Sequence, residues 1–135
     1  MPGKFLYQRK DKLKSRKLIG KVFETSQSLS VFPLKVLYLQ TPLPVNTTIQ
    51  SGFTVGRKNF PKAIHRNRIK RLMRETYRMN NALLKEVIKK YEIQLALFFI
   101  FTGKSLPDYE QVNRAMQKIF LELKIRFDEN SIENS

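Results

Sequence analysis

The sequence predicts a single two-layer α/β domain with elements in the order helix, strands, helix, strand, helix. Its 135 residues, 41% of them hydrophobic, suffice for one domain with a real core but not for two of ordinary size. Apolar residues alternate between helical spacing and short β-branched or aromatic runs. No internal repeat or long linker divides the chain. We therefore expect one domain over residues 1–127, with 1–9 flexible and the Ser/Asn-rich segment 128–135 a disordered tail.

The N-terminal half predicts one helix and two strands. Ser15 is placed to cap a first helix that carries an apolar face. That face consists of Leu18, Ile19, Val22 and Phe23. Residues 31–40, "VFPLKVLYLQ", are typical of a strand, with Pro33 at an edge or before pairing begins. Residues 48–56 predict a second strand that ends at Gly56, and Gly52 within it indicates a bulge or a close backbone approach.

The C-terminal half predicts a long basic helix, a buried strand and a final helix. The basic helix has Pro61 in its first turn and runs to about Lys90, with a break near residues 79–81. Residues 93–102 are almost continuously apolar, as in a strand that is buried on both faces. The final helix carries its apolar residues at helical spacing. These are Val112, Ala115, Met116, Ile119, Phe120 and Leu123.

The charge of the chain indicates a polyanionic partner. Lys and Arg number 26 and Asp and Glu 11, which gives a formal net charge of +15. Residues 4–21 hold eight basic side chains and one acid, and residues 57–78 hold nine basic side chains and one acid. A compact domain tolerates such self-repulsion more easily when it binds a polyanion. Nucleic acid is the leading candidate and an anionic membrane surface the second.

Other classes of protein are disfavoured by what the chain lacks. There is no cysteine, so disulfides and thiolate metal sites are excluded, and a single histidine, His65, cannot build a histidine-rich metal site. The N-terminus lacks the apolar core of a signal peptide. The longest apolar stretch, 95–101, is far shorter than the roughly 20 residues that span a bilayer. We therefore expect a soluble, cytoplasmic protein with no metal site of its own.

Residues 65–78, "HRNRIKRLMRETYR", predict a helix with two different faces. At about 100° per residue, one arc of roughly 140° is apolar; it contains Ile69, Leu72, Met73, Thr76 and Tyr77. The opposite arc of about 100° is polar and cationic; it contains Asn67, Lys70, Arg71, Arg74 and Arg78. Arg66 and Arg68 flank the apolar arc. The helix should therefore be anchored on one side and present cations on the other.

The cationic arc could be an ordinary solvated face, which is what most charge runs are. Solvated faces usually place Glu four residues from Lys, because like charges at that spacing repel. Here Lys70, Arg74 and Arg78 are like charges at that spacing. Arg also outnumbers Lys five to one over residues 65–78, which favours bidentate phosphate contacts. The pattern favours an RNA or DNA surface.

Residues 53–78, "FTVGRKNFPKAIHRNRIKRLMRETYR", resemble the signature segment of the bacterial ribonuclease P protein subunit. The signature is a strand, a Lys-rich connection and then Ala-x-x-Arg-Asn-Arg-x-Lys-Arg-x-x-Arg-Glu, which begins here at Ala63 and ends without a gap at Glu75. The resemblance extends over roughly residues 10–127. It implies a fold with a left-handed βαβ crossover, as in ribosomal-protein-S5-domain-2-like folds.

The resemblance also implies the function and the residues that perform it. The family assists removal of the 5′ leader from precursor tRNA, and the chemistry is done by the catalytic RNA with Mg²⁺ held by that RNA, so no catalytic or metal-binding residue is expected in the protein. The expected partners are the catalytic RNA and precursor tRNA, with no membrane and no obligate protein partner. The implied catalytic-RNA contacts are Arg66, Asn67, Arg68, Lys70, Arg71 and Arg74. The implied leader contacts, in a cleft between sheet and first helix, are Phe23, Val36, Tyr38, Arg57 and Lys58.

Two positions depart from the family pattern, and three other functions remain as alternatives. Ile19 stands where an aromatic residue is usual, and Gly56 where a serine is common. A ribosomal-type structural RNA-binding protein shares the charge pattern but not the continuous signature. A DNA-binding regulator could use residues 62–78 as a recognition helix. A self-sufficient nuclease is disfavoured because Glu75 stands alone among cations, without a cluster of acids to hold metal.

Overall fold

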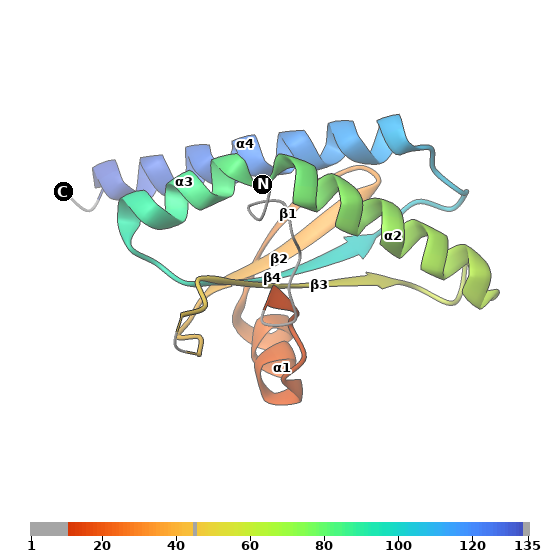
Figure 1. Cartoon of the computed structure of the whole chain (residues 1–135), viewed down its shortest axis with the longest axis horizontal. Helices are drawn as coiled ribbons and strands as arrows, with labels where there is room; N and C mark the ends of the chain where they lie inside the picture. The colour runs from red at the N-terminus through yellow and green to blue at the C-terminus, as the bar shows by residue number, and fades with distance from the viewer. Residues whose placement is uncertain (1–10, 45, 134–135) are drawn as a thin grey trace.

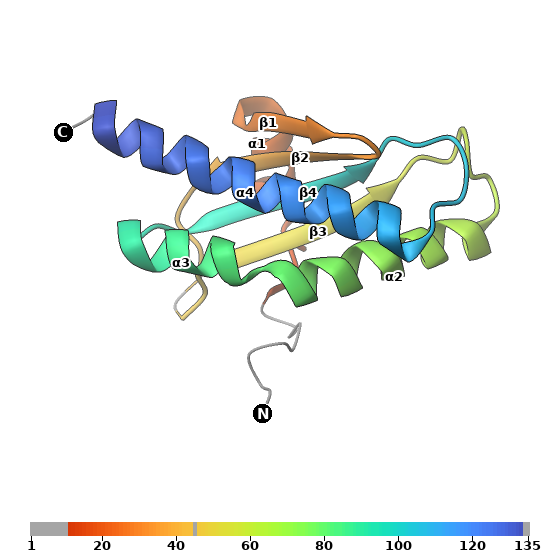
Figure 2. The same cartoon turned by 90° about the horizontal axis from the view of Figure 1, so that it is seen from above.

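The structure, a computed structural model that describes residues 11–44 and 46–133, is built on one four-stranded mixed sheet. The strand order is β1-β2-β4-β3. Helices α2, α3 and α4 cover one face of the sheet, and α1 lies on the other (Figures 1 and 2). The predicted α/β class is confirmed. The sheet and its three-helix layer form the main body, and α1 adds a partial third layer.

Strands β1 (Gln27–Val31) and β2 (Leu34–Gln40) form an antiparallel hairpin. The prediction of one strand over 31–40 was wrong at its start, because the turn between the two strands contains Pro33. Strand β1 was not expected, since its sequence "QSLSV" is mostly polar. Only Leu29 of this edge strand is buried, so its apolar signal was too weak to reveal it.

Strand β4 (Leu95–Phe101) is central, antiparallel to β2 and parallel to β3 (Ile49–Val55). Five of its seven residues are buried, as a continuous apolar run predicts. Gly52 pairs in regular register with Phe98, so it marks a close approach and not a bulge. A Cβ at Gly52 would lie 2.8 Å from two carbons of the Phe98 ring.

Helices α2 (Ala63–Asn80) and α3 (Ala82–Tyr91) connect β3 to its parallel neighbour β4. The break between them is at Asn81, where it was predicted. Pro61 was expected in the first turn of this helix, but it lies just before the helix, whose N-cap is Lys62. The two helices and α4 pack on the sheet around a core that includes the rings of Tyr77, Phe99 and Phe120.

Helix α1 (Arg16–Thr25) begins where the sequence predicted, and Ser15 Oγ accepts a hydrogen bond from the Leu18 backbone N–H at 3.2 Å. It packs through Val22 on a small second cluster with Leu13 and Ala96. Helix α1 lies on the face of the sheet opposite α2, α3 and α4 (Figure 1), so this cluster is separate from the main core.

Helix α4 (Tyr109–Glu133) extends well into the segment predicted as a disordered tail. Asp128 explains the extension, since its carboxylate accepts hydrogen bonds from the Tyr91 hydroxyl and from Lys124 Nζ, the latter at 2.9 Å. The Tyr91 and Lys124 hydrogen bonds lower the pKa of Asp128 well below its usual range. The prediction for 128–135 is therefore wrong for 128–133, while the predictions for 1–9 and for 134–135 lie outside the described residues.

Candidate nucleic-acid interface

Helix α2 is fastened to the domain by the apolar arc that its sequence predicted. Ile69, Met73, Thr76 and Tyr77 are buried, and Leu72 is half-buried against the core. The Thr76 hydroxyl is a buried polar group in this arc, and it donates to the Leu72 carbonyl at 2.9 Å. This bond satisfies a side chain that would otherwise be costly to bury. The orientation of the helix is therefore set by packing.

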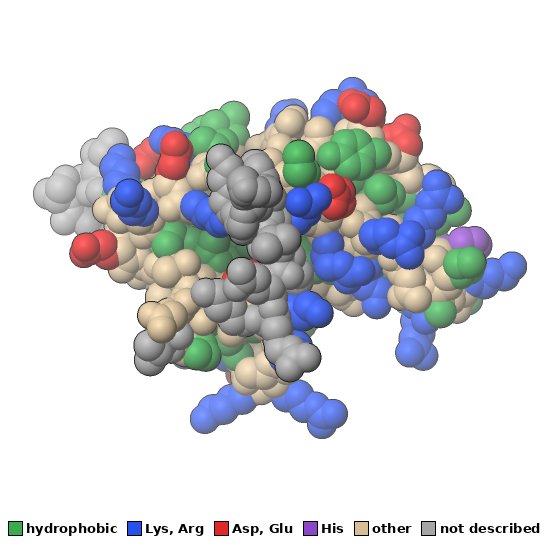
Figure 3. Space-filling model, viewed as in Figure 1, with side chains coloured by type: hydrophobic (Ala, Val, Ile, Leu, Met, Phe, Trp, Pro, Cys, Tyr) green, Lys and Arg blue, Asp and Glu red, His purple; other side chains and the backbone are tan. Residues whose placement is uncertain are grey.

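The opposite side of α2 presents cations to solvent, as predicted. Asn67, Arg68, Arg71 and Arg74 are exposed, and Lys70 is half-exposed. Within residues 11–44 and 46–133, Arg68, Arg71 and Arg74 have no carboxylate partner. Lys and Arg side chains gather over the outer part of α2 in the space-filling view, beside the single histidine (Figure 3). We call Asn67, Arg68, Lys70, Arg71 and Arg74 the arginine face.

Arg78 and Arg66 differ from the arginine face, although the helical arc and the family signature grouped them with it. Arg78 Nη2 lies 2.6 Å from Glu75 Oε1, so the charge of Arg78 is paired. Arg66 Nη1 donates to the carbonyl oxygens of Phe60 at 2.9 Å and Pro61 at 2.7 Å. Arg66 therefore ties the connection before α2 to the helix, which gives it a structural contact that the sequence did not indicate.

On the other face of the sheet, Phe23 of α1 stands over β4. Its side chain is 53% exposed, and its ring packs edge to face on Phe98 with 5.1 Å between centroids. Phe98 lies in the segment 93–102, which was expected to be buried on both faces; its side chain is half-buried and lies on the α1 face. Ile19 packs on the same cluster. Arg57 and Lys58, which follow the end of β3, are exposed.

Val36 and Tyr38 do not lie beside Phe23, and the prediction that they border one cleft with it was wrong. Both side chains are buried in the main core on the opposite face, with exposed fractions of 0% and 5%. The Tyr38 hydroxyl donates to Gln27 Oε1 at 2.9 Å and accepts from Arg126 Nη1 at 2.8 Å. Successive residues of a strand point to opposite faces of the sheet. An error of one residue therefore assigns every side chain of the strand to the wrong face.

The residues of β2 that share the α1 face are the odd-numbered ones. Leu37 is half-buried against the cluster under α1 and pairs with Phe98 of β4. Lys35, two residues before Leu37, points to the same side and is half-exposed. Both residues were missed from the sequence, because the odd-numbered and the even-numbered positions of β2 are both largely apolar and no alternation shows which face is buried. Only the polar residue Lys35 could have indicated which positions face the solvent side.

The described residues show neither a metal-binding cluster of side chains nor a membrane-spanning helix. In residues 11–44 and 46–133, no three His, Cys, Asp or Glu side chains gather where they could hold an ion. No helix in the same ranges has the length and apolar character to cross a membrane.

Comparisons with known proteins agree with the geometry. The protein family described as Ribonuclease P matches residues 7–124. The ribonuclease P protein component of Porphyromonas gingivalis is 32% identical over 133 residues, which cover 98% of this chain and 97% of that protein. The corresponding component of Chlorobium phaeobacteroides is 29% identical and covers 84% of each chain.

A solved structure shows the same fold at lower sequence identity. The RNase P protein of Staphylococcus aureus superposes with a TM-score of 0.61 at 17% identity, over 84% of this chain and 94% of that one. The similarity of fold, the extent of the sequence match and the arginine face on α2 lead to one assignment. The chain belongs to the ribonuclease P protein family.

Proposed function

We propose that this chain is the protein component of ribonuclease P and that it assists removal of the 5′ leader from precursor tRNA in the cytoplasm. The observation that carries the proposal is the arginine face, whose three exposed arginines have no carboxylate partner in the described residues and lie within the family signature. We assign the arginine face and Arg66 to the catalytic RNA. Guanidinium groups suit this role because they contact phosphates in pairs of hydrogen bonds.

The second RNA contact that we propose is the leader site on the α1 face. Phe23 offers an exposed ring supported by Phe98, and Arg57 and Lys58 supply charge at the end of β3. Single-strand sites combine such aromatic platforms with cations that follow the backbone. Leu37 and Lys35 replace Val36 and Tyr38 in this site, because they share its face.

In this proposal the RNA subunit performs the chemistry and holds the Mg²⁺. The protein's cations reduce the repulsion between the catalytic RNA and the precursor, since each phosphate contact releases condensed counterions. The holoenzyme should consequently work at a lower divalent-ion concentration than the RNA alone. Family membership further supports a left-handed sense for the crossover from β3 through α2 and α3 to β4.

Reconstitution tests the proposal directly. Purified protein is added to the catalytic RNA and precursor tRNA at low Mg²⁺, and cleavage at the mature 5′ end is measured. Stimulation is expected with the complete mixture, and no cleavage is expected from the protein without the RNA. If the protein fails to stimulate cleavage, the proposed function is wrong. A preference for duplex DNA over RNA in competition would instead favour a DNA-binding regulator.

A further inference from the structure

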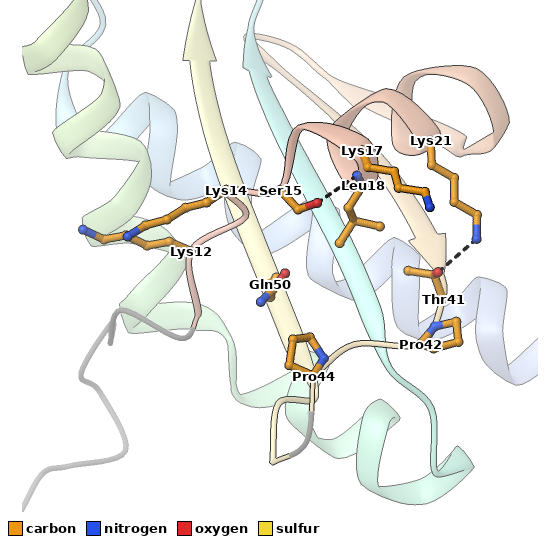
Figure 4. Close-up of a pocket in the computed structure, with 10 residues that line it drawn as sticks. All are labelled: Lys12, Lys14, Ser15, Lys17, Leu18, Lys21, Thr41, Pro42, Pro44 and Gln50. Atoms are coloured by element: carbon orange, nitrogen blue, oxygen red, sulfur yellow. Dashed lines mark hydrogen bonds between the residues drawn. The ribbon is translucent and has the colours of Figure 1, made fainter.

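A cavity lies on the other side of α1 from Phe23. It has a volume of about 660 Å³, within the range of roughly 300–1,000 Å³ that is typical of ligand sites. Its walls come from the segment before α1, from α1 itself, from the loop after β2 and from β3 (Figure 4). Lys21 of this cavity and Phe23 point about 160° apart around the helix axis, so α1 separates the two sites.

Four lysines are among the residues that line this cavity, which we call the lysine pocket: Lys12, Lys14, Lys17 and Lys21. No Asp or Glu lines it, and none of the four lysines has an ion-pair partner in the part of the chain that the structure describes. Lys21 Nζ donates to Thr41 Oγ1 at 3.3 Å, a neutral partner that leaves its charge uncompensated. The pocket therefore attracts anions.

The lysines form two groups. Lys17 and Lys21 run side by side from α1, and Lys21 reaches Thr41 (Figure 4). Lys12 and Lys14 extend to the other side of β3 in the same view. Cations in two groups suit a ligand that carries phosphates at intervals along a chain.

The interior of the lysine pocket is apolar. Leu18 of α1 and Pro42 and Pro44 of the loop line it, together with Gln50 of β3 (Figure 4). These side chains offer flat hydrocarbon surface to a base, although they lack the aromatic rings of a strong stacking site. Cations around an apolar interior are the combination that single-stranded nucleic acid binds, since its bases are unpaired and its phosphates are spaced along the chain.

We propose that the lysine pocket is a second site for single-stranded RNA, distinct from the leader site at Phe23. A base lies against Leu18, Pro42 and Pro44, and the flanking phosphates contact the two groups of lysines. The identification of the polyanion as RNA rests on the proposed function. The strand comes from the catalytic RNA or from precursor tRNA; the chemistry is the same, and the experiment below separates the two sources.

Crosslinking in the holoenzyme locates the strand. The natural chain has no cysteine, so Pro42→Cys introduces a single thiol at an exposed position of the lysine pocket, to which a photoactivated crosslinker is attached. The catalytic RNA and precursor tRNA carry different labels, and the crosslinked nucleotide is mapped. The matched control is Gln111→Cys, exposed on α4 across the sheet. We expect a crosslink to a single-stranded nucleotide of one RNA from Pro42→Cys only.

A binding experiment with the free protein measures the charge contribution. Lys17→Ala/Lys21→Ala is compared with Lys104→Ala/Lys118→Ala, which removes the same charge from exposed positions outside the pocket. The ligand is a fluorescent single-stranded decaribonucleotide, titrated at several salt concentrations. The slope of log affinity against log salt should fall by about 1.4 in the pocket variant, because each lost single-strand contact removes about 0.7. It should change little in the control. Thermal melts confirm that both variants are folded.

Two results would overturn the inference. One is equal salt slopes in the pocket and control variants. The other is an active Pro42→Cys holoenzyme that gives no crosslink, or crosslinks to duplex RNA only. Neither result touches the proposed function, which fails only if the natural protein does not stimulate cleavage at low Mg²⁺. The oligonucleotide titration needs no catalytic RNA, so it decides the inference even in that case.

Discussion

Phe23 and Phe98 pack edge to face between α1 and β4, with 5.1 Å between ring centroids. The Phe98 side chain is half-buried, and the Phe23 side chain is 53% exposed. The Phe23 ring therefore keeps much of its surface exposed, while its contact with Phe98 fixes its orientation. Pre-ordering of this kind favours binding, because less side-chain entropy is lost when a base stacks on it.

We predict that Phe23→Ala lowers the affinity for precursor tRNA far more than it lowers stability. Loss of the aromatic pair should cost roughly 0.5–1.5 kcal/mol of unfolding free energy beyond the small area buried. Stacking of one base contributes about 1–3 kcal/mol of binding. Denaturant unfolding and precursor binding to the holoenzyme measure the two quantities.

Phe99→Ala is the control for Phe23→Ala, because Phe99 is fully buried. It should cost about 3–5 kcal/mol of unfolding free energy. A Phe23→Ala protein that is as destabilised as Phe99→Ala, with unchanged affinity for the precursor, would show that Phe23 serves only the fold.

Tyr38→Phe should affect stability and leave leader binding unchanged. The hydroxyl accepts a hydrogen bond from Arg126 and donates one to Gln27. Its removal should cost roughly 1–3 kcal/mol, since a partly buried charged donor loses its acceptor. Tyr109→Phe, at a 40% exposed position, is the matched control. Weaker precursor binding by a Tyr38→Phe protein of normal stability would contradict the placement of Tyr38 away from the leader site.

Arg68→Ala and Arg71→Ala should each weaken assembly with the catalytic RNA. The slope of log affinity against log salt should fall by about 0.7–0.9 per variant, which corresponds to one lost phosphate contact. Arg114→Ala, at an exposed position of α4, removes the same charge elsewhere and should leave the slope nearly unchanged. Filter binding at several salt concentrations is sufficient. If Arg68→Ala, Arg71→Ala and Arg114→Ala all show the same salt slope, the arginine face does not contact the catalytic RNA.

Arg66→Ala should act through the connection before α2. Its guanidinium holds the carbonyls of Phe60 and Pro61, so we expect a loss of about 1 kcal/mol of stability and faster hydrogen exchange in residues 57–62. Arg66→Lys should recover only part of this, because an ammonium lacks the planar geometry of a guanidinium. Normal exchange in Arg66→Ala, together with a lower salt slope, would instead make Arg66 a pure phosphate contact.

Asp128→Asn should lower stability in a pH-dependent way. Hydrogen bonds from Tyr91 and Lys124 lower the pKa of Asp128 below its unfolded value, so its ionised form contributes stability above that unfolded value, near pH 4. The contribution is lost as the pH falls toward the folded pKa. The difference in Tm between the natural protein and Asp128→Asn should therefore be largest near pH 7 and shrink below about pH 4. A difference that does not vary with pH would exclude this role.

Helices were predicted from the sequence more successfully than strands. The two faces of α2 followed from residue spacing, because a helix has a fixed period of about 3.6 residues and its buried arc is visible in the sequence. The N-cap at Ser15 and the break at Asn81 were also local signals. Strand β1 was missed because an edge strand needs few apolar residues when its pairing to β2 supplies the backbone hydrogen bonds.

The extent of α4 and the role of Arg66 depend on contacts between distant or poorly marked segments. The Asp128 carboxylate accepts a hydrogen bond from Tyr91, 37 positions away in the chain. The composition of residues 128–135 alone had predicted a disordered tail. Arg66 donates hydrogen bonds to the carbonyls of Phe60 and Pro61, in the loop before α2. A side-chain contact with a loop produces no periodic pattern in the sequence. Both features follow from tertiary packing.

By itself the sequence determined the fold class, the family and the cationic side of α2, since each depends on local spacing or on a contiguous signature. Only the tertiary structure decided which face of β2 meets α1. Val36 and Leu37 are both apolar, and a strand offers two faces that differ by one residue. Val36 and Tyr38 are buried against the layer formed by α2, α3 and α4, whereas Leu37 and Phe98 pack in the cluster under α1. The fold likewise brought Lys12, Lys14, Lys17 and Lys21 together with the loop after β2, because a pocket exists only where distant segments meet.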